Sequence, residues 1–514
     1  MSLMATLNTR IPNKKNLSLL FFAALVVRAA VFFFYVQHEE RYQQPDSNDY
    51  HIYAAKIVLN QPMPRYWRTP GYPLYLSIFY RFFGVHSGTF SASSATQKAA
   101  IWGQIILSSL IPLILFFLAY ALTGSYLIAW ILAWISVIHL GLVLASTYLL
   151  TEGIALIFFY LFLLFFYKSF RAYGEYSREN RPPLFAPTSH NALPKKDFKF
   201  EIFHQGKPYL SLAVAALSLG ITTWMRPMGL FIAIIAAALL LLFAQDTIQI
   251  KLKKVAFFLV IFFASIAPWY MRNYQRTGKI FFCPMFGIYL NSFTAPRILR
   301  DIYGLPLEKT WGYLQHQLSL EIQKDIQRKG LTNITPATKN LPIPELLAGT
   351  ISWPIVLAHP WLAAMEWSKE VCISTFDLYS YQLIALVKKS FKSDPLEAFL
   401  GERLAECLYR QPVPLFIRSL CWLEFIFSIF LWIGLLAGIW FFLLRTLIKK
   451  FQVPNELKAH GGLWLKTGFL IGATLFMTGG FGYARLRLPV EPLIIVLALT
   501  SWIYILKKKS HSQE

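Results

Sequence analysis

Residues 17–36, with the sequence LSLLFFAALVVRAAVFFFYV, decide the fold class of this chain. Arg28 is the only charged residue among them. A helix needs about 20 mostly apolar residues to cross the ~30 Å hydrocarbon core of a bilayer. Lys14 and Lys15 precede the run, as in a signal peptide, but the run is too long for one and no A-x-A cleavage site follows it. The segment therefore predicts an uncleaved membrane-spanning helix.

Apolar runs of similar length recur along the whole chain and predict an all-α polytopic membrane protein with about 10 spans. The expected spans are residues 17–36, 100–120, 125–146, 149–167, 209–225, 228–244, 255–272, 416–446, 462–480 and 488–506. Two further apolar stretches, 351–366 and 374–390, contain Pro, His, Asp and Lys, so interfacial or re-entrant helices are expected there. If both stretches cross the bilayer, the total rises to about 12.

The composition excludes a water-soluble fold. Of the 514 residues 56% are hydrophobic and only 15% are charged, whereas soluble domains contain about 25% charged residues. The formal net charge of +23 would suggest nucleic acid as a partner of a soluble protein. Here Lys and Arg lie in short segments beside the apolar runs, as the positive-inside rule expects, and no DNA or RNA motif occurs. Membrane lipid, and not nucleic acid, is the expected partner.

The short basic loops predict the orientation in the membrane. Both termini are expected in the cytoplasm, together with loop 168–208, whose part 178–208 resembles a linker. The long loops 37–99 and 273–415 are then non-cytoplasmic, because long loops translocate whatever their charge. The expected regions are 1–272, an N-terminal catalytic membrane region; 273–415, an outer loop; and 416–514, the C-terminal spans. The plasma (inner) membrane is the expected location.

Polar residues of unusual type collect on the outer side once this topology is drawn. The segments that contain them are Pro45-Asp46-Ser47-Asn48-Asp49-Tyr50, Arg68-Thr69-Pro70-Gly71-Tyr72-Pro73, Thr151-Glu152, Arg226-Pro227, Pro268-Trp269-Tyr270-Met271-Arg272-Asn273 and Arg485-Leu486-Arg487-Leu488-Pro489. They are far apart in sequence but are expected at one membrane depth. Their convergence predicts a functional site at the non-cytoplasmic mouth of the bundle.

Several of these residues also have a purely structural explanation. Asp46 is a candidate N-cap of an amphipathic helix over 46–60, with Asp49 completing a pair that resembles a capping box. In such a helix Asp46, Asp49, Tyr50 and Tyr53 share one face. Glu152 follows a candidate N-cap, Thr151, and suits the positive end of a helix dipole.

The arginines and aromatics of these segments have structural explanations as well. Arg226, Arg272 and Arg485 could snorkel to the membrane interface. Tyr72 and Trp269 suit an interfacial aromatic belt.

The ordered set of these segments resembles the GT-C superfamily of membrane glycosyltransferases. The most similar branch is the group of aminoarabinose transferases and protein O-mannosyltransferases. The matching pieces are the first-loop acidic motif and the R-T-P-G-Y-P, T-E, R-P, P-W-Y-M-R-N and R-L-R-L-P segments. The resemblance covers nearly the whole chain except loop 273–415. It implies a polyprenyl-phosphate-linked sugar as donor and transfer at the outer membrane face.

The resemblance also implies roles for the site residues. The first-loop aspartate of such families is the expected catalytic base, which is Asp46 here. These families often have two adjacent acids, but Ser47 follows Asp46, so Asp49 is an assistant or alternative base. A sugar phosphate already has a stable anionic leaving group, unlike a glycosidase substrate, so one base and phosphate-binding cations suffice. Glu152 is a further candidate catalytic residue, as another alternative base. The expected phosphate ligands are Arg485, Arg487, Arg272, Arg226 and Arg68, and the expected pocket residues are Tyr50, Tyr53, Tyr72 and Trp269.

Other functions remain open at this point. A transporter or flippase for a lipid-linked or anionic solute would explain the spans and the cations, and a polysaccharide polymerase or ligase would share the donor chemistry. Asp46, Asp49 and His51 could bind a divalent cation, although no distinctive ligand spacing occurs. The sequence identifies neither the sugar nor the acceptor, which could be a lipid, a glycan or a protein.

Overall fold

The computed structural model of the chain is helical throughout the part that it describes. The described residues are 13–61, 68–85, 92–170, 208–244, 246–331, 343–381, 384, 408, 414–440, 455–478 and 484–511. Within these ranges every regular element is a helix and no β-strand occurs. The expected all-α class is therefore confirmed. The expected linker 178–208 lies outside the described residues except for Pro208.

Each of the expected apolar runs contains helix. The first is α2 (Lys14–Val31), which continues into the π-helical turn η1 (Phe32–Val36). The others are α6 (Ser94–Ser108), α7 (Ile111–Thr123), α8 (Tyr126–Ile138), α9 (Leu140–Thr147), α10 (Glu152–Ser169), α12 (Pro208–Met225), α13 (Met228–Phe243), α14 (Ile248–Thr277), α22 (Leu415–Ile439), α24 (Asn455–Thr478) and α25 (Glu491–His511).

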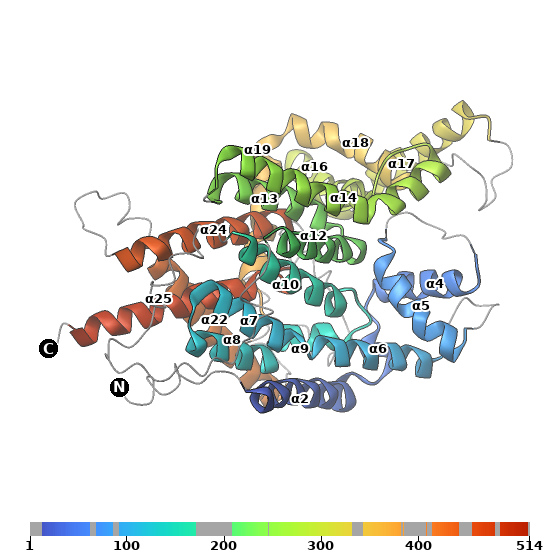
Figure 1. The fold of residues 1–514 in the computed structure, drawn as a ribbon. Helices are drawn as coiled ribbons and strands as arrows, with labels where there is room; N and C mark the ends of the chain where they lie inside the picture. Colours follow the sequence, from blue (N-terminus) through green and yellow to red (C-terminus); the bar gives the residue numbers. More distant parts are fainter. Residues whose placement is uncertain are drawn as a thin grey trace.

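Helix α10 lies inside the bundle and packs against α12, α7 and α6 (Figure 1). Of its apolar window 72% is buried, against 22% for α2 and for α22. The side chains of α10 itself are apolar on nearly all sides of the helix, which is typical of a helix in the core. Glu152 begins this helix, so the core of the bundle fixes the position of its carboxylate.

The number of membrane crossings differs from the sequence-based expectation. Five helices of the described residues are long and apolar enough to cross a bilayer, or up to seven if each bent helix pair is one span. One bent pair is α8–α9, with an angle of 48° between its helices. Helix α13 has 16 residues and counts as a shorter apolar helix, because about 20 are needed to cross. The expected total of about 10 is not confirmed.

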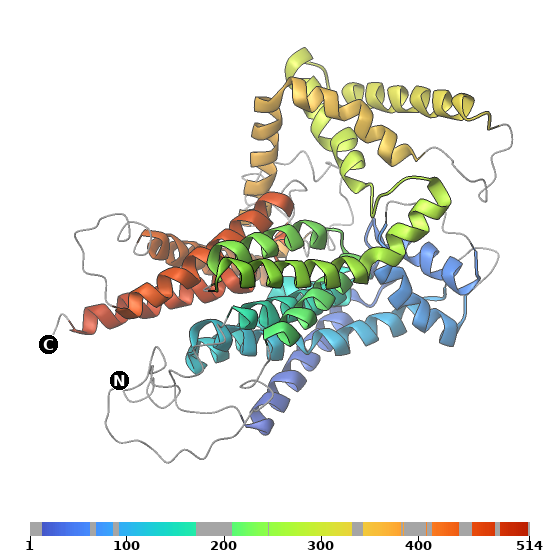
Figure 2. The same cartoon turned by 45° about the horizontal axis from the view of Figure 1, so that its top comes forward.

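Residues 37–99, for which we keep the name first outer loop from the sequence-based expectation, are largely helical where the structure describes them. It contains α3 (Glu39–Tyr42), α4 (Ser47–Val58) and α5 (Gly71–Phe83). The amphipathic helix expected over 46–60 is therefore present as α4. In the views of Figures 1 and 2, α4 and α5 lie together at one end of the bundle, and the C-terminal end of α25 lies at the other.

The described part of residues 273–415, which were expected to be the second outer loop, forms a further group of helices that contacts α24 through α19. Its described elements are α15 (Met285–Tyr289), η3 (Leu290–Thr294), α16 (Ala295–Tyr303), α17 (Leu307–Arg328), α18 (Pro344–Ala358) and α19 (Pro360–Phe376). Helices α18 and α19 meet at 107°, and Figure 2 shows this sharp corner. The apolar stretch 351–366 lies across this bend, a geometry that suits a re-entrant loop or a broken span. Much of the stretch 374–390 lies outside the described residues.

Candidate active site

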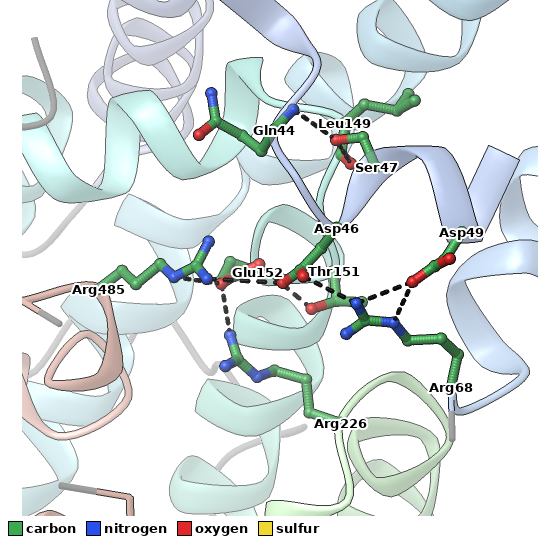
Figure 3. Close-up of polar contacts among 10 residues, drawn as sticks. All are labelled: Gln44, Asp46, Ser47, Asp49, Arg68, Leu149, Thr151, Glu152, Arg226 and Arg485. Atoms are coloured by element: carbon green, nitrogen blue, oxygen red, sulfur yellow. Dashed lines mark hydrogen bonds and ion pairs between the residues drawn. The ribbon is translucent and has the colours of Figure 1, made fainter. Parts of the chain in front are cut away.

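Arg68 joins the two aspartates of the first outer loop. Its Nη2 lies 2.8 Å from Asp46 Oδ1 and 3.0 Å from Asp49 Oδ2, and its Nε donates to Asp49 Oδ2 at 3.1 Å (Figure 3). Asp46 stands at the N-cap position of α4, but its side chain makes no capping hydrogen bond. Positions three apart on a helix lie on one face, so both carboxylates reach the same guanidinium.

Tyr50 lies on the face of α4 that also contains Asp46 and Asp49, and its ring packs against Arg68. The guanidinium carbon of Arg68 is 5.2 Å from the centroid of the Tyr50 ring, which allows a cation–π contact. Burial raises the pKa of Tyr50 to about 12, and the neighbouring Arg68 opposes part of that rise. The phenol therefore stays protonated at neutral pH, and Arg68 keeps its charge.

Two hydrogen bonds of Ser47 hold the start of α4 against the turn that precedes Glu152. Ser47 Oγ donates to the carbonyl of Leu149 at 2.8 Å and accepts from the backbone N–H of Gln44 at 2.8 Å. The N–H of Leu149 donates in turn to the carbonyl of Tyr42 at 3.0 Å. Two segments about a hundred positions apart in sequence are thereby held side by side.

The segment that contains Arg68 is fixed against the end of α12. Thr69 Oγ1 donates to the carbonyl of Met225 at 2.7 Å. Gly71 packs so closely on the backbone of Trp224 that an added Cβ would lie 2.6 Å from its carbonyl carbon and oxygen. A glycine is required here by close backbone approach. These contacts hold the segment that follows Arg68 against Trp224 and Met225, the two residues that precede Arg226.

Glu152 lies in the first turn of α10 and pairs with two arginines from other elements. Arg226 Nη1 is 2.8 Å from Glu152 Oε1. Arg485, in the 3-10 turn η6 (Ala484–Leu486), places its Nε 3.6 Å from the same oxygen. Arg485 Nη2 also lies 3.6 Å from Asp46 Oδ2, so Arg485 bridges the first loop and α10.

Six charged side chains thus form one charged cluster around the start of α4 and the start of α10 (Figure 3). The charged cluster consists of Asp49, Arg68, Asp46, Arg485, Glu152 and Arg226, in the order in which neighbours pair. Three carboxylates and three guanidinium groups balance one another. In an environment of low dielectric constant, such pairing avoids the cost of an uncompensated charge.

Solvent exposure divides the charged cluster into two parts. The side chains of Arg68 and Glu152 are 7% and 6% exposed, whereas those of Asp46 and Arg485 are 35% and 26% exposed. A small cavity of about 10 Å³ lies beside the cluster. Its lining residues are Glu152, Ala155, Leu156, Phe159, Thr222, Arg226, Met228, Arg485 and Pro489. The accessible members can meet a ligand, and the buried ones hold them in place.

Gln104 is a positioning residue that the sequence analysis missed. Its Nε2 donates to the carbonyls of Ala145, Ser146 and Tyr148 at 3.2, 3.0 and 2.8 Å, and its Oε1 accepts from Tyr72 Oη at 3.0 Å. These bonds satisfy the backbone of the turn between α9 and α10. A buried amide within an apolar span was the available signal, since polar residues in spans usually serve a specific partner.

Arg487 lies in a second group of polar residues, although only one residue separates it from Arg485. Its Nη2 is 3.2 Å from Glu491 Oε1, and its Nη1 donates to the carbonyls of Thr375 and Asp377. Glu491 also accepts from Tyr379 Oη and lies 3.5 Å from His139 Nε2. We call Arg487, Glu491, Tyr379 and His139 the buried cluster; the side chains of Arg487 and Glu491 are 4% and 7% exposed.

The remaining residues that the sequence singled out have other surroundings. Arg272 donates to Asn273 Oδ1 at 2.8 Å and lies 4.4 Å above the ring of Trp269. Trp269 donates through Nε1 to the carbonyl of Phe282 at 2.9 Å. Tyr72 contacts Tyr50 edge to face, and Tyr53 is buried on α4. The structure thus brings Tyr50 and Tyr72 close to the charged cluster, while Arg272 and Trp269 form their own pair.

His51, considered as a metal ligand with the two aspartates, has other partners. Its Nδ1 lies 2.7 Å from Tyr80 Oη, and its Nε2 accepts from the N–H of Ala92 at 3.2 Å. Nε2 therefore has no proton, and burial lowers the pKa of this imidazole. Among the described residues, no group of three His, Cys, Asp or Glu side chains is arranged to hold a metal ion.

The fold and the charged cluster describe a helical protein with several candidate membrane spans and a site in which acids and arginines from the first loop, α10, η6 and the turn after α12 meet. A family model described as dolichyl-phosphate-mannose-protein mannosyltransferase matches residues 76–186. No curated protein matches the chain.

Solved structures of two proteins align with the chain. Archaeal oligosaccharyltransferase AglB from Archaeoglobus fulgidus, in complex with an inhibitory peptide and a dolichol-phosphate, aligns with a TM-score of 0.50 and 12% identity. The alignment covers 96% of this chain and 50% of AglB, so the chain spans about half the length of that protein. ArnT from Cupriavidus metallidurans, bound to undecaprenyl phosphate, aligns with a TM-score of 0.35 and 13% identity, covering 94% of this chain and 79% of ArnT. The AglB fold and the family-model match confirm the expected resemblance to GT-C glycosyltransferases.

Proposed function

We propose that the chain is a glycosyltransferase that moves a monosaccharide from a polyprenyl-phosphate donor to an acceptor of the cell envelope. The acceptor is a lipid, a glycan or a protein. The charged cluster is the observation that supports this proposal best, because it presents a partly exposed carboxylate beside partly exposed arginines. The proposed site faces the non-cytoplasmic side of the plasma membrane, with both termini in the cytoplasm.

Asp46 is the proposed general base, with Asp49 as the assistant or alternative base. The acceptor hydroxyl gives its proton to Asp46 as its oxygen forms a bond to the anomeric carbon of the sugar. The bond between that carbon and the phosphate oxygen breaks, and the polyprenyl phosphate leaves with the electron pair. Attack opposite to the phosphate inverts the anomeric centre. No acid is needed for the leaving group, because the departing phosphate is a stable anion.

Arg485 and Arg226 are the proposed ligands of the donor phosphate. Both side chains are partly exposed and line the small cavity beside Glu152. Guanidinium groups bind phosphate through paired, charge-assisted hydrogen bonds. Arg68 holds the two aspartates and completes the positive charge at the site. Glu152 orients Arg226 and Arg485. Tyr50 packs against Arg68 and contacts Tyr72, so both support the site from the buried side. Tyr53 and Trp269 stay sequence-based candidates for the substrate pocket.

Arg487 and Arg272 have other partners, and we propose positioning roles for them. Arg487 is bonded to Glu491 and to two backbone carbonyls, so it fixes the turn that contains Arg485. Tyr160 supports the same turn by donating to the carbonyl of Leu488 at 2.6 Å. Arg272 lies over Trp269 near the end of α14. The backbone at Arg485 is therefore fixed, and the proposed phosphate ligand projects from a rigid turn.

A transporter of lipid-linked solutes is the second candidate. The bent pair α8–α9 favours it, because broken helices inside the bundle are frequent in transporters. The family-model match and the fold favour the transferase. Incubation of the purified protein with a polyprenyl-phosphate sugar and envelope lipids separates the two, because a transporter releases no polyprenyl phosphate.

The first test compares envelope glycolipids and glycoproteins by mass spectrometry in cells that lack the gene and express wild type or Asp46→Asn. A product that differs by one sugar should vanish in the deletion and in the variant. General-base catalysis contributes about 10²–10⁴-fold, so the purified variant should lose that much of kcat. Equal amounts of folded protein must be verified for both. Transfer at the full rate by Asp46→Asn would exclude Asp46 as the base.

A further inference from the structure

The two carboxylate oxygens of Asp46 have unequal partners. Oδ1 accepts a hydrogen bond of 2.8 Å from Arg68, whose side chain is 7% exposed. Oδ2 faces Arg485 Nη2 at 3.6 Å, and Arg485 is 26% exposed. Hydrogen bonds of N–H groups to oxygen usually measure 2.7–3.2 Å. The contact with Arg68 is therefore a closed hydrogen bond, whereas the contact with Arg485 is a looser ion pair.

Arg485 divides its charge between two acids. Its Nε lies 3.6 Å from Glu152 Oε1, the same oxygen that Arg226 binds at 2.8 Å. The backbone that follows Arg485 is fixed by the bonds of Arg487 and by the hydrogen bond from Tyr160 to Leu488. Arg485 can therefore exchange partners by rotation of its partly exposed side chain while the turn stays in place.

The charge balance of the cluster changes when a phosphate arrives. Without a donor, three carboxylates neutralise three arginines. A phosphate group adds negative charge beside Arg485 and Arg226, where it competes with Asp46 and Glu152 for the same donors. The guanidinium of Arg485 gains more from a phosphate than from a carboxylate 3.6 Å away, because it can donate two hydrogen bonds to the phosphate at once.

We propose that Arg485 is an exchangeable counter-ion, held by Asp46 in the empty site and transferred to the phosphate when the polyprenyl-phosphate donor binds. The inference rests on the proposed function and adds a regulation to it. Release of Arg485 frees Asp46 Oδ2, while Oδ1 stays bonded to Arg68 and keeps the carboxylate in place. The base can then accept a proton from the acceptor only after the donor has bound. Donor binding therefore precedes acceptor activation.

A binding experiment with Asp46→Asn tests the exchange. A polyprenyl phosphate without sugar, titrated into the detergent-solubilised protein, reports affinity independently of catalysis. Asn keeps the shape of Asp but removes the charge that competes for Arg485. The variant should bind polyprenyl phosphate more tightly than wild type, by roughly three- to fivefold, because a partly exposed ion pair no longer has to be broken. A base with no other role predicts unchanged affinity.

Asp49→Asn is the matched control. Asp49 contacts Arg68 through Oδ2 at 3.0 and 3.1 Å. Its substitution by Asn removes one negative charge from the site, as Asp46→Asn does. Its effect on polyprenyl-phosphate affinity should stay below about twofold. A polyprenol, which has the same tail but no phosphate, should bind wild type and Asp46→Asn equally. Thermal melting verifies that both variants are folded.

Three results would overturn the exchange: unchanged or weaker binding by Asp46→Asn, equal tightening by Asp49→Asn, or equal tightening for the polyprenol. The second result would assign the effect to general electrostatics, and the third to the lipid tail. Absence of polyprenyl-phosphate binding in folded wild type and both variants would instead reject the proposed donor class. Failure of the exchange and failure of the proposed function are therefore distinguishable.

Discussion

The charged cluster and the buried cluster both pair acids with arginines, yet they differ in how closed they are. In the charged cluster, Arg485 lies 3.6 Å from each of two carboxylates and is 26% exposed. In the buried cluster, Arg487 is 4% exposed and bonded to Glu491 and to two carbonyls. Two arginines separated by one residue thus have different surroundings. From this difference we expect the loose, accessible pairs of Arg485 to exchange partners with a ligand and the closed pairs of Arg487 to hold the structure.

The strongest test of this comparison is the stability of Arg487→Ala against Arg485→Ala. Loss of Arg487 leaves Glu491 buried without its main counter-ion, which typically costs about 3–5 kcal/mol of unfolding free energy. Loss of Arg485 should cost about 1 kcal/mol or less, because its pairs are partly exposed. Thermal melting in detergent measures both. The comparison is wrong if Arg485→Ala destabilises the protein as much as Arg487→Ala does.

The transfer reaction should reverse this order. Arg485→Ala should lower kcat/KM for the lipid-linked donor by about 10- to 100-fold, because charge-assisted hydrogen bonds contribute about 1.5–3 kcal/mol. Arg485→Lys should recover part of the loss, since lysine supplies the charge but not the planar fork. Steady-state rates at several donor concentrations measure this. Equal rates for Arg485→Ala and wild type would remove Arg485 from the donor site.

Gly71→Ala tests how the first outer loop is attached to the bundle. The added methyl group would lie 2.6 Å from the backbone of Trp224, so the segment must shift away from α12. Overpacking of this kind costs about 1–3 kcal/mol. Gly312→Ala in α17 is the control, because no atom lies within 4 Å of its added Cβ. Thermal melting should show a loss for Gly71→Ala and none for Gly312→Ala.

Ser47→Ala should have the smallest effect of the set. The substitution removes the hydrogen bond to the carbonyl of Leu149 and the acceptor for the N–H of Gln44. Loss of such bonds costs about 1 kcal/mol of stability. Asp46 is its chain neighbour, so kcat should fall by up to about tenfold as the carboxylate loses its fixed position. Full stability together with full activity would show that other contacts position α4.

The first outer loop shows how much of the structure could be predicted from local sequence patterns. The helix expected over 46–60 forms as Ser47–Val58, because the helical period and the apolar face are local properties of the sequence. The proximity of Asp46, Asp49, Arg68, Glu152, Arg226 and Arg485 was expected from topology alone and is found in the structure. Their chemical roles stay predictions.

The tertiary structure decided what topology could not. The sequence assigned Arg485 and Arg487 the same role, but the turn from 484 to 490 directs them to different partners. Asp46 was a candidate N-cap, yet its carboxylate pairs with Arg68 in place of the backbone. Gln104 and Ser47 gained positioning roles through carbonyls about 40 and 100 residues away along the chain.

The sequence by itself determined that this chain is an all-helical membrane protein with acids and arginines at one end of its bundle. Long apolar runs and clustered charges specify that outcome, because the bilayer selects helices whose backbone is satisfied internally. The tertiary structure decided which arginine meets which acid, how tightly, and which pairs stay open to a ligand. Those choices depend on differences of less than about one ångström in the contact distances between segments far apart in sequence, and the packing of the folded chain sets them.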